Sequence, residues 1–285
     1  MEQPGQEEGP PPPPTAFGNT SISSRERRVY LGFIVLVAGL VWGAYMGGRM
    51  LAGHLATKTP YAWDQSLGAV AKQQFLVGAT QCDNPVLVGA VEQIVLRLSA
   101  GLDPEFRDIQ VHVLADDKIN AFALPGGQVF VLTGLLQELQ SPQELVGVLG
   151  HELGHVVKRH GMQRIAQSLW FSFIMAQLFG DVSGIGEAMT VGALDLVETG
   201  FGRDQERESD EFGLDLMRRV GYEPRDFPSF FGRLPDRGMP EFLSTHPDPG
   251  QRAETLRQAI AELRPLDSPV APPTLEMLKA PCHDR

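Results

Sequence analysis

The chain has 285 residues, of which 42% are hydrophobic, and its formal net charge at pH 7 is -11. This length allows one sizeable domain or two small ones, each with a hydrophobic core. The acidic balance argues against nucleic acid and anionic membrane surfaces as partners, because both select clustered lysine and arginine. We therefore expect a globular protein that binds no nucleic acid and takes proteins, peptides or small molecules as partners.

The N-terminal region divides into a polar tail and an apolar run. Residues 1–28 are rich in proline, glycine and serine and carry too few apolar side chains to join a core, which predicts a disordered tail. Residues 29–48 contain no charged side chain. About 20 such residues are what a helix needs to cross a bilayer. We predict a single transmembrane helix here.

The arginines before this run predict its orientation. Arg25, Arg27 and Arg28 favour an N-terminus in the cytoplasm, which would leave the rest of the chain outside it, in a periplasmic or equivalent space. A cleaved signal peptide is the alternative, but its apolar region usually has about 7–15 residues. An uncleaved, single-pass anchor fits the longer run better.

The two cysteines leave one question open. In an oxidising compartment Cys82 and Cys282 could pair and tie the C-terminus to the early part of the domain. Two unrelated free thiols are the simpler interpretation. The sequence does not decide between them, nor does it predict an oligomeric state.

Between the anchor and the C-terminus we expect one domain. Residues 49–66 are predicted as a linker, residues 67–265 as the domain and residues 266–285 as a proline-rich tail. Two helices separated by a Cys-Asp-Asn-Pro break are predicted over residues 73–98, and two strands over residues 109–116 and 128–133. The fold class is therefore α+β, mainly helical with a small sheet.

A further helix begins with a complete start signal. Ser141 can cap it, Pro142 fits its first turn, and Glu144 stands three residues after the serine. Apolar residues at helical spacing continue to Gly161, where the helix is expected to end. Glycines inside it lower helix propensity and predict close approach of a neighbouring element.

This helix carries the sequence His151-Glu152-Leu153-Gly154-His155. Histidines four residues apart lie on the same helix face, so both imidazoles can bind one zinc ion at about 2.0–2.1 Å. Glu152 beside them can take a proton from a zinc-bound water whose pKa the metal lowers to about 7. The motif occurs by chance in roughly one sequence per hundred of this composition, so a third ligand is needed.

A second helix, predicted over Arg203–Arg219, offers that ligand. Glu206 and Asp210 are four residues apart on one face. Glu206 can complete a His-His-Glu zinc site, while Asp210 can accept the ring N–H of a zinc-binding histidine and orient it. A solvated face of ion pairs explains the same pattern about equally well.

Four ordered motifs together resemble metallopeptidase family 48. They are His-Glu-Leu-Gly-His, the Glu206–Asp210 spacing followed by Gly213, the segment Asn120–Leu136, and Ser244-Thr245-His246-Pro247 with the residues up to Arg252. This family contains the HtpX-like, BepA-like and CAAX prenyl proteases. The resemblance spans residues 73–263 and implies a gluzincin-type zincin fold with one zinc ion per chain.

The resemblance also implies roles for individual residues. It places His151, His155 and Glu206 on zinc, with Glu152 as the catalytic base and Asp210 as the residue that orients a ligand. It implies that the strand with Gly127, Gln128, Val129, Phe130 and Val131 is a sheet edge on which a substrate peptide docks as an added strand. It further brings His246 toward the metal, either as a fourth ligand or as a donor to the oxyanion.

The expected protein is a membrane-anchored zinc endopeptidase that hydrolyses misfolded or misassembled envelope proteins. It would have one anchor where HtpX-like enzymes have several spans, and no C-terminal helical repeats of the BepA-like kind. The alternative is a latent, zinc-containing adaptor tethered to the membrane. The apolar segments at residues 168–180 and 185–197 are expected to be core, or else a hairpin that covers the cleft or touches the membrane.

Overall fold

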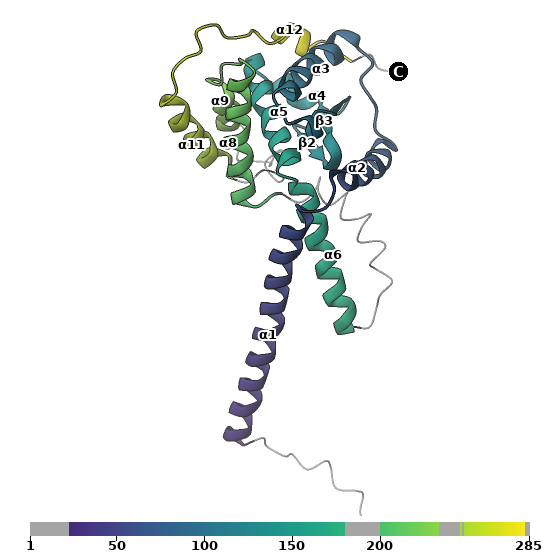
Figure 1. Ribbon diagram of the computed structural model, residues 1–285, viewed down its shortest axis with the longest axis vertical. Helices are drawn as coiled ribbons and strands as arrows, with labels where there is room; N and C mark the ends of the chain where they lie inside the picture. The colour runs from purple at the N-terminus through teal and green to yellow at the C-terminus, as the bar shows by residue number, and fades with distance from the viewer. Residues whose placement is uncertain (1–22, 180–199, 234–245, 247, 283–285) are drawn as a thin grey trace, which may run out of the picture. The chain divides into compact units, whose positions relative to one another are not determined.

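The computed structural model describes residues 23–179, 200–233, 246 and 248–282. The chain divides into two compact units, residues 1–44 and 45–285. The predicted segments at residues 1–22 and 185–197 lie outside the described residues. The fold is mainly helical with one small sheet, as predicted (Figure 1).

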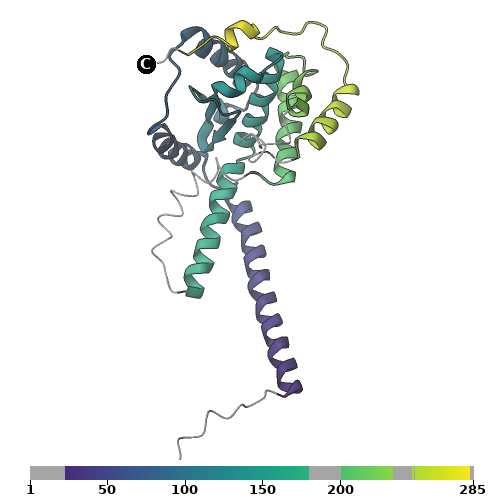
Figure 2. The same ribbon diagram turned by 180° about the vertical axis from the view of Figure 1, so that it is seen from behind.

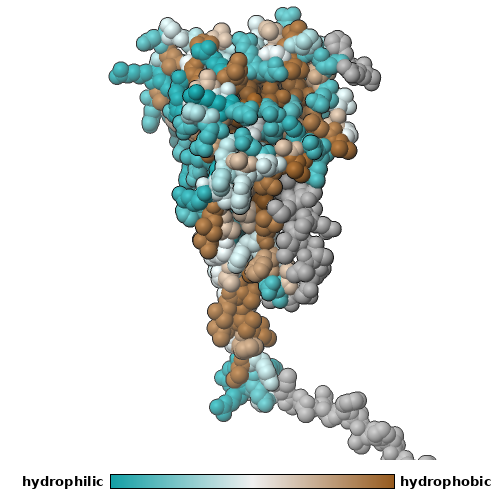
Figure 3. Space-filling model, turned by 45° about the vertical axis from the view of Figure 1, so that its right-hand side comes forward, coloured by the Kyte–Doolittle hydropathy of each residue, from teal (hydrophilic) through white to brown (hydrophobic). Residues whose placement is uncertain are grey.

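The first helix, α1, covers Ser24–Ala56. It begins with a capping box, in which Ser23 Oγ accepts from the Glu26 N–H and Glu26 Oε2 accepts from the Ser23 N–H. Within the described residues, α1 is the one helix long and apolar enough to cross a membrane. Its hydrophobic side chains are exposed, and the helix is mostly brown in Figure 3 up to its hydrophilic first turn.

The second unit contains the sheet and the other helices. Their bounds are α2 Tyr61–Leu76, α3 Pro85–Ala100, β1 Gln110–Leu114, β2 Ala121–Leu124, β3 Gln128–Leu132, α4 Thr133–Glu138, α5 Pro142–Val157, α6 His160–Phe179, α8 Arg203–Arg219, α9 Phe227–Arg233, α11 Pro249–Ala261 and α12 Leu275–Leu278.

The sheet has the order β1-β3-β2. β3 runs parallel to β1, with Val111 opposite Val129, and antiparallel to β2, with Phe122 opposite Phe130. The prediction that β3 is a sheet edge is therefore wrong, because both of its sides are already paired. β2 is a strand that the sequence did not predict, and it forms the edge against which α5 packs.

Alternation along β3 explains why every residue of this strand is buried. Val129 and Val131 belong to the main core with α3 and α5, whereas Phe130 belongs to a second cluster with Phe122 and Ile165. The sheet thus has hydrophobic side chains on both faces, and helices pack against each face (Figures 1 and 2).

Helix α5 is the central helix of the unit. Its apolar residues Leu145, Val148, Leu149 and Val156 are buried. Pro142 occupies the first turn, but the Ser141 side chain makes no capping hydrogen bond, and Glu144 instead pairs with an arginine of α9.

The end of α5 differs from the prediction. The helix stops at Val157, and Arg159 adopts a positive φ of 56° before α6 begins at His160. The Arg159 side chain forms a buried ion pair with Asp64 and donates to the Thr59 carbonyl at 2.6 Å. These contacts hold the chain that follows α1 against the end of the histidine-bearing helix.

Glycines let α8 approach α5 closely. A Cβ atom at Gly154 would lie 2.8 Å from Ser209 Cα, and one at Gly150 would lie 3.3 Å from Gly213 Cα. Any larger residue at Gly154 would push the helices apart, which confirms the packing reason expected for these glycines. The two helices that carry the predicted ligands are therefore held side by side.

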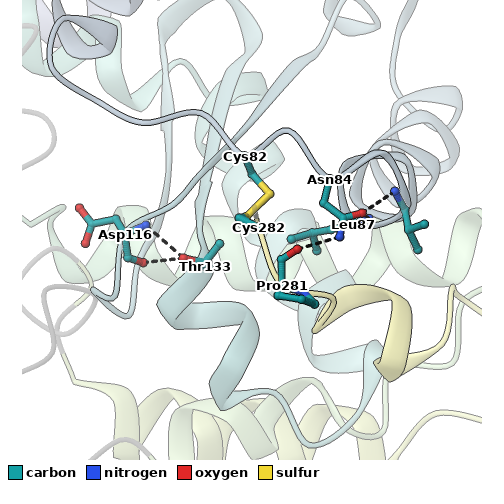
Figure 4. The surroundings of a disulfide bond; sticks show 8 residues. Cys82, Asn84, Leu87, Asp116, Thr133, Pro281 and Cys282 are labelled. Atoms are coloured by element: carbon teal, nitrogen blue, oxygen red, sulfur yellow. Dashed lines mark hydrogen bonds between the residues drawn. A yellow bond between two sulfur atoms is a disulfide. The ribbon is translucent and has the colours of Figure 1, made fainter. Parts of the chain in front are cut away.

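The two cysteines form a disulfide. Cys82 and Cys282 are joined across 200 residues, with their Cα atoms 5.2 Å apart. Beside the bridge, the Asn84 side chain caps α3 and donates to the Pro281 carbonyl (Figure 4). Leu278 of α12 is fully buried in the main core. The C-terminal segment, predicted as a tail, is therefore packed onto the domain.

Candidate metal centre

Four predicted residues meet at the crossing of α5 and α8. His151 and His155 come from α5, Glu206 comes from α8, and His246 lies in the segment before α11. Each offers one ligand atom, and these atoms all lie within 4.8 Å of one another. All four residues are almost completely buried.

The distances between the ligand atoms suit a small cation. His151 Nε2 lies 3.0 Å from His155 Nε2 and 3.4 Å from Glu206 Oε2. Ligands placed tetrahedrally at about 2.0–2.1 Å from a metal are separated by roughly 3.3 Å. Two imidazole lone pairs and a carboxylate so close together repel unless a cation or proton lies among them, so the group fits a metal ion.

Asp210 lies where it can orient the first histidine. His151 Nδ1 donates to Asp210 Oδ1 at 2.9 Å, and a proton on Nδ1 leaves the Nε2 lone pair facing the other ligand atoms. Asp210 is one turn beyond Glu206 on α8, so a single helix face supplies both carboxylates. This arrangement favours the ligand interpretation over a solvated face of ion pairs.

His160 plays the matching part for the second histidine. His160 Nδ1 lies 2.9 Å from His155 Nδ1, so one proton is shared between the two rings. Burial lowers the pKa of His160 to about 4, which keeps its ring neutral at neutral pH. A neutral His160 can accept the Nδ1 proton of His155 and leave the Nε2 lone pair of His155 toward the centre. The sequence predicted no role for His160.

Arg252, the last residue of the fourth motif, is a second residue for which the sequence predicted no role. It is buried on α11, with Nη1 2.7 Å from Glu206 Oε2 and Nη2 2.7 Å from Asp210 Oδ1. Its guanidinium also lies over the Phe231 ring, 4.4 Å from the ring centroid. One cation thus holds both carboxylates of α8 in place.

These neighbours shift the pKa values within the centre. Burial and the Arg252 charge lower the pKa of His151, but the Glu206 charge and the hydrogen bonds to Asp210 and Glu206 together raise it to about 9. Burial lowers the pKa of His155 well below its usual range. Burial opposes ionisation of Glu206, yet His246 and His151 hold its pKa well below its usual range. Glu206 is therefore ionised and His155 neutral at neutral pH, which are the forms that bind metal, whereas the metal-free His151 ring is protonated and must release a proton when a metal binds.

Glu152 lies beside the ligand atoms without being one of them. Its carboxylate is fully buried, and Oε1 lies 3.4 Å from His246 Nε2. Neither of its oxygens accepts a well-aligned hydrogen bond from the described residues, although the Ala123 backbone is near enough to lower the pKa of this carboxyl. Burial raises the pKa of Glu152. A buried carboxylate with free acceptor positions can take a proton from a molecule bound at the centre.

His246 contacts both the ligands and Glu152. Its Nδ1 lies 3.1 Å from Glu206 Oε2 and 3.2 Å from His151 Nε2. Both roles predicted for it, a fourth metal ligand and a donor to the oxyanion, are thus compatible with the structure. Of the residues predicted as the edge strand, Gln128, Val129, Phe130 and Val131 lie on the central strand β3 and Gly127 lies in the turn before it, and all five are buried.

Comparison with known families gives one match. A family described as Peptidase family M48 matches residues 86–260, which include every residue of the candidate centre.

Curated relatives are similar over the same region. The mitochondrial metalloendopeptidase OMA1 of Arabidopsis thaliana is 38% identical over 153 residues, covering 53% of this chain and 31% of the relative. The beta-barrel assembly-enhancing protease of Escherichia coli (strain K12) is 27% identical over 218 residues, covering 71% of this chain and 45% of the relative. The mitochondrial metalloendopeptidase OMA1 of Schizosaccharomyces pombe is 32% identical over 161 residues, covering 54% of this chain and 47% of the relative. This chain spans less than half the length of these relatives.

Proposed function

This chain belongs to peptidase family M48, and on that premise we propose that it is a membrane-anchored zinc endopeptidase that hydrolyses misfolded or misassembled proteins of the cell envelope. The observation that carries the proposal is the buried group of His151, His155 and Glu206 with Glu152 beside it. A structural metal site has no need of a free carboxylate at this place.

The donor set favours zinc as the metal. Two imidazole nitrogens and one carboxylate oxygen match the ligands that catalytic zinc takes, with one position left for water. Bound there, zinc would lower the pKa of that water to about 7 and polarise a peptide carbonyl. We assign His151, His155 and Glu206 as its ligands and Asp210 as the residue that orients His151.

Glu152 is proposed as the general base. Its free oxygens lie within the centre, and the raised pKa suits a group that first accepts a proton and then delivers it to the leaving amine. A substrate peptide would lie along β2, because this edge strand packs against α5. β2 replaces β3 in this role, since an added strand needs an edge with unpaired backbone groups.

The membrane placement rests on α1 and on the disulfide. We propose that residues 29–48 cross the membrane, that residues 1–28 lie on the cytoplasmic side, and that the domain beginning near residue 67 lies outside the cytoplasm. The Cys82–Cys282 bridge supports this orientation, because disulfides persist in oxidising compartments. Alkaline phosphatase fused at the C-terminus should be active, whereas a cytoplasmic reporter signal from that fusion would overturn the orientation.

Two substitutions test the assigned roles separately. Glu152→Gln should abolish nearly all cleavage of casein by the purified chain in detergent and leave its zinc content unchanged. Glu206→Gln should lower the zinc content after dialysis, because an amide is a weaker ligand than a carboxylate. Glu211→Gln on the exposed face of α8 is the matched control and should change neither quantity.

The same experiment separates the enzyme from a latent adaptor. Appreciable turnover by the Glu152→Gln protein would exclude Glu152 as the base. If the parent chain retains zinc but cleaves neither casein nor unfolded envelope proteins, the adaptor function would be favoured over the endopeptidase.

A further inference from the structure

The second half of α6 carries hydrophobic side chains that face solvent. Phe171 is 48% exposed and Phe173 is 44% exposed. From Ile165 to Phe179 the helix contains no charged residue. In Figures 1 and 2 this part of α6 projects from the rest of the sheet and helices of its unit. The prediction that residues 168–180 belong to the core is therefore wrong for both phenylalanines, and such a surface indicates an interaction site.

The middle of α6 contacts the last part of α1. Arg49 Nε donates to Gln167 Oε1 at 3.0 Å, and the Trp170 indole lies directly against the backbone of Gly48. The rings of Tyr45 and Phe171 meet edge to face, with their centroids 5.9 Å apart. Residue numbers fall along α1 as they rise along α6, so the two helices are antiparallel at this contact.

We propose that α6 enters the lipid bilayer from Trp170 onward. This inference rests on the proposed membrane anchor at residues 29–48. Tyr45 and Gly48 belong to the last turn of that anchor and contact Phe171 and Trp170. The aromatic rings of α6 therefore lie at the depth of the membrane interface, where tryptophan and tyrosine are favoured.

The rest of α6 suits a partial insertion. From Phe171 to Phe179 the helix rises about 12 Å, which is less than half of a hydrocarbon layer of roughly 30 Å. The absence of charge from Ile165 to Phe179 lowers the cost of entering lipid. Arg164 and Arg49 lie at the polar end of this segment. Tyr45 and Gly48, the anchor residues that α6 contacts, belong to the end of the proposed span, so lipid is the occupant that the contacts favour.

Insertion of α6 would set the distance between the metal centre and the membrane surface. The helix starts at His160, which contacts His155, and Trp170 follows ten residues later. At a rise of 1.5 Å per residue the centre lies on the order of 15 Å from the membrane interface. The metal centre would then meet peptide bonds that lie on the order of 15 Å from the bilayer surface.

Depth-dependent fluorescence quenching tests the proposal. The full-length chain carrying Phe173→Cys is labelled with an environment-sensitive dye and reconstituted into nanodiscs that contain lipids with quenchers along their tails. The native cysteines are oxidised and do not react. Val35→Cys in α1 serves as the lipid-exposed reference and Leu96→Cys on α3 as the water-exposed reference; these residues are 69% and 73% exposed.

The proposal predicts that the dye at residue 173 emits at shorter wavelength than the dye at residue 96 and is quenched by the tail-labelled lipids. Gln177→Cys, an exposed polar position one turn further on, should behave in the same way and guards against disruption caused by loss of the phenylalanine.

Unquenched emission at residues 173 and 177, together with quenching at residue 35, would overturn the α6 insertion and leave the anchor intact. Absence of quenching at residue 35 would overturn the anchor itself, and with it this inference. The dye at residue 173 could instead emit at short wavelength without being quenched by the labelled lipids, and shift to longer wavelength as the protein is diluted. That result would overturn the proposal and assign the surface to contact with a second copy of the chain.

Discussion

Arg252 links three parts of the candidate centre that come from different segments of the chain. The Arg252 guanidinium lies on α11 and pairs with two carboxylates of α8, Glu206 and Asp210. Asp210 in turn contacts His151 on α5. The carboxylates of Glu152, Glu206 and Asp210 are all buried within this region. Without a cation from the protein, their mutual repulsion would drive α8 away from α5. Arg252 is therefore a positioning residue for the metal ligands.

Replacing Arg252 should weaken metal binding. For Arg252→Gln we expect the zinc dissociation constant to rise about 10–100-fold, the range found when groups that orient metal ligands are lost. Arg252→Lys keeps the charge but not the forked geometry, so its affinity should fall between those of Gln and the parent. Competition with a chromogenic chelator measures the affinity without reference to catalysis.

A control on the same helix makes this measurement specific. Arg257 of α11 is about half exposed and pairs with Glu254, so Arg257→Gln should leave the zinc affinity unchanged. Equal affinities for Arg252→Gln and the parent would show that the guanidinium only fills space.

His246 offers a second test at the same scale. Its ring contacts Glu206 and Glu152 at once, so it can either block the water position at rest or donate to the developing oxyanion. We expect the blocking role, because His246 Nδ1 lies 3.1 Å from the proposed ligand Glu206, whereas Nε2 lies 3.4 Å from Glu152. His246→Ala should then raise basal proteolysis. An oxyanion donor would instead cost about 10²–10³ in rate when removed. Rates are compared at equal zinc occupancy, and an unchanged rate would remove His246 from the site.

Residue spacing predicted the group of His151, His155, Glu206 and Asp210 but neither Arg252 nor His160. His151 and His155 are local on one helix, and Glu206 and Asp210 on another, so spacing alone brings each pair to one face. Arg252 and His160 show no such spacing with their partners. Their roles depend on how α11 and α6 pack, and nothing in a single sequence distinguishes a buried arginine from the exposed ones around it.

At the scale of elements, the contact between α5 and α8 determines whether the ligands meet. Gly154 stands where Ser209 comes nearest, and the 2.8 Å separation leaves no space for a methyl group. Gly154→Ala should therefore separate the helices despite the higher helix propensity of alanine. We expect a loss of about 1–3 kcal/mol in the free energy of unfolding and a lower zinc affinity.

The matched control is a glycine of α3. Nothing lies within 4 Å of a Cβ atom at Gly89, so Gly89→Ala should be neutral or stabilising by up to about 1 kcal/mol. Urea denaturation in detergent and chelator competition compare the two substitutions. A Gly154→Ala protein as stable as the Gly89→Ala protein would show that the crossing tolerates a wider separation.

Helices were easier to predict than the sheet. The helical periods of α3, α5 and α8 are long, and their positions follow from the sequence. β2 is only four residues long and lies directly before Pro125 and two glycines, so it resembled a loop. Strand order is a non-local property, and the edge position of β2 depends on β3 inserting between β1 and β2.

The predicted end of α5 at Gly161 is wrong for a different reason, since the helix ends at Val157. Gly161 has the chemistry of a helix stop, yet Arg159 takes the positive φ that glycine would normally supply. Its ion pair with Asp64 and its bonds to Thr57 and Thr59 offset the strain of that conformation. Tertiary contacts with the segment after α1 thus move the helix boundary.

At the scale of the whole molecule, the disulfide joins the beginning and the end of the domain. A bridge across 200 residues restricts the unfolded chain strongly, and loss of a native disulfide typically costs about 2–5 kcal/mol. We expect Cys282→Ser to lower the free energy of unfolding by this order and to free the segment after Leu278. Urea titrations of the parent with and without reductant should reproduce the difference, and a stability independent of reductant would contradict it.

The same bridge also alters what a single cut in the backbone can do. Any peptide bond between residues 83 and 281 lies inside the covalent ring that Cys82 and Cys282 close. A molecule nicked once there, by itself or by another protease, loses no mass and releases no fragment until the bridge is reduced. Self-processing would therefore be invisible on a gel run without reductant and would appear as two bands when a thiol is added.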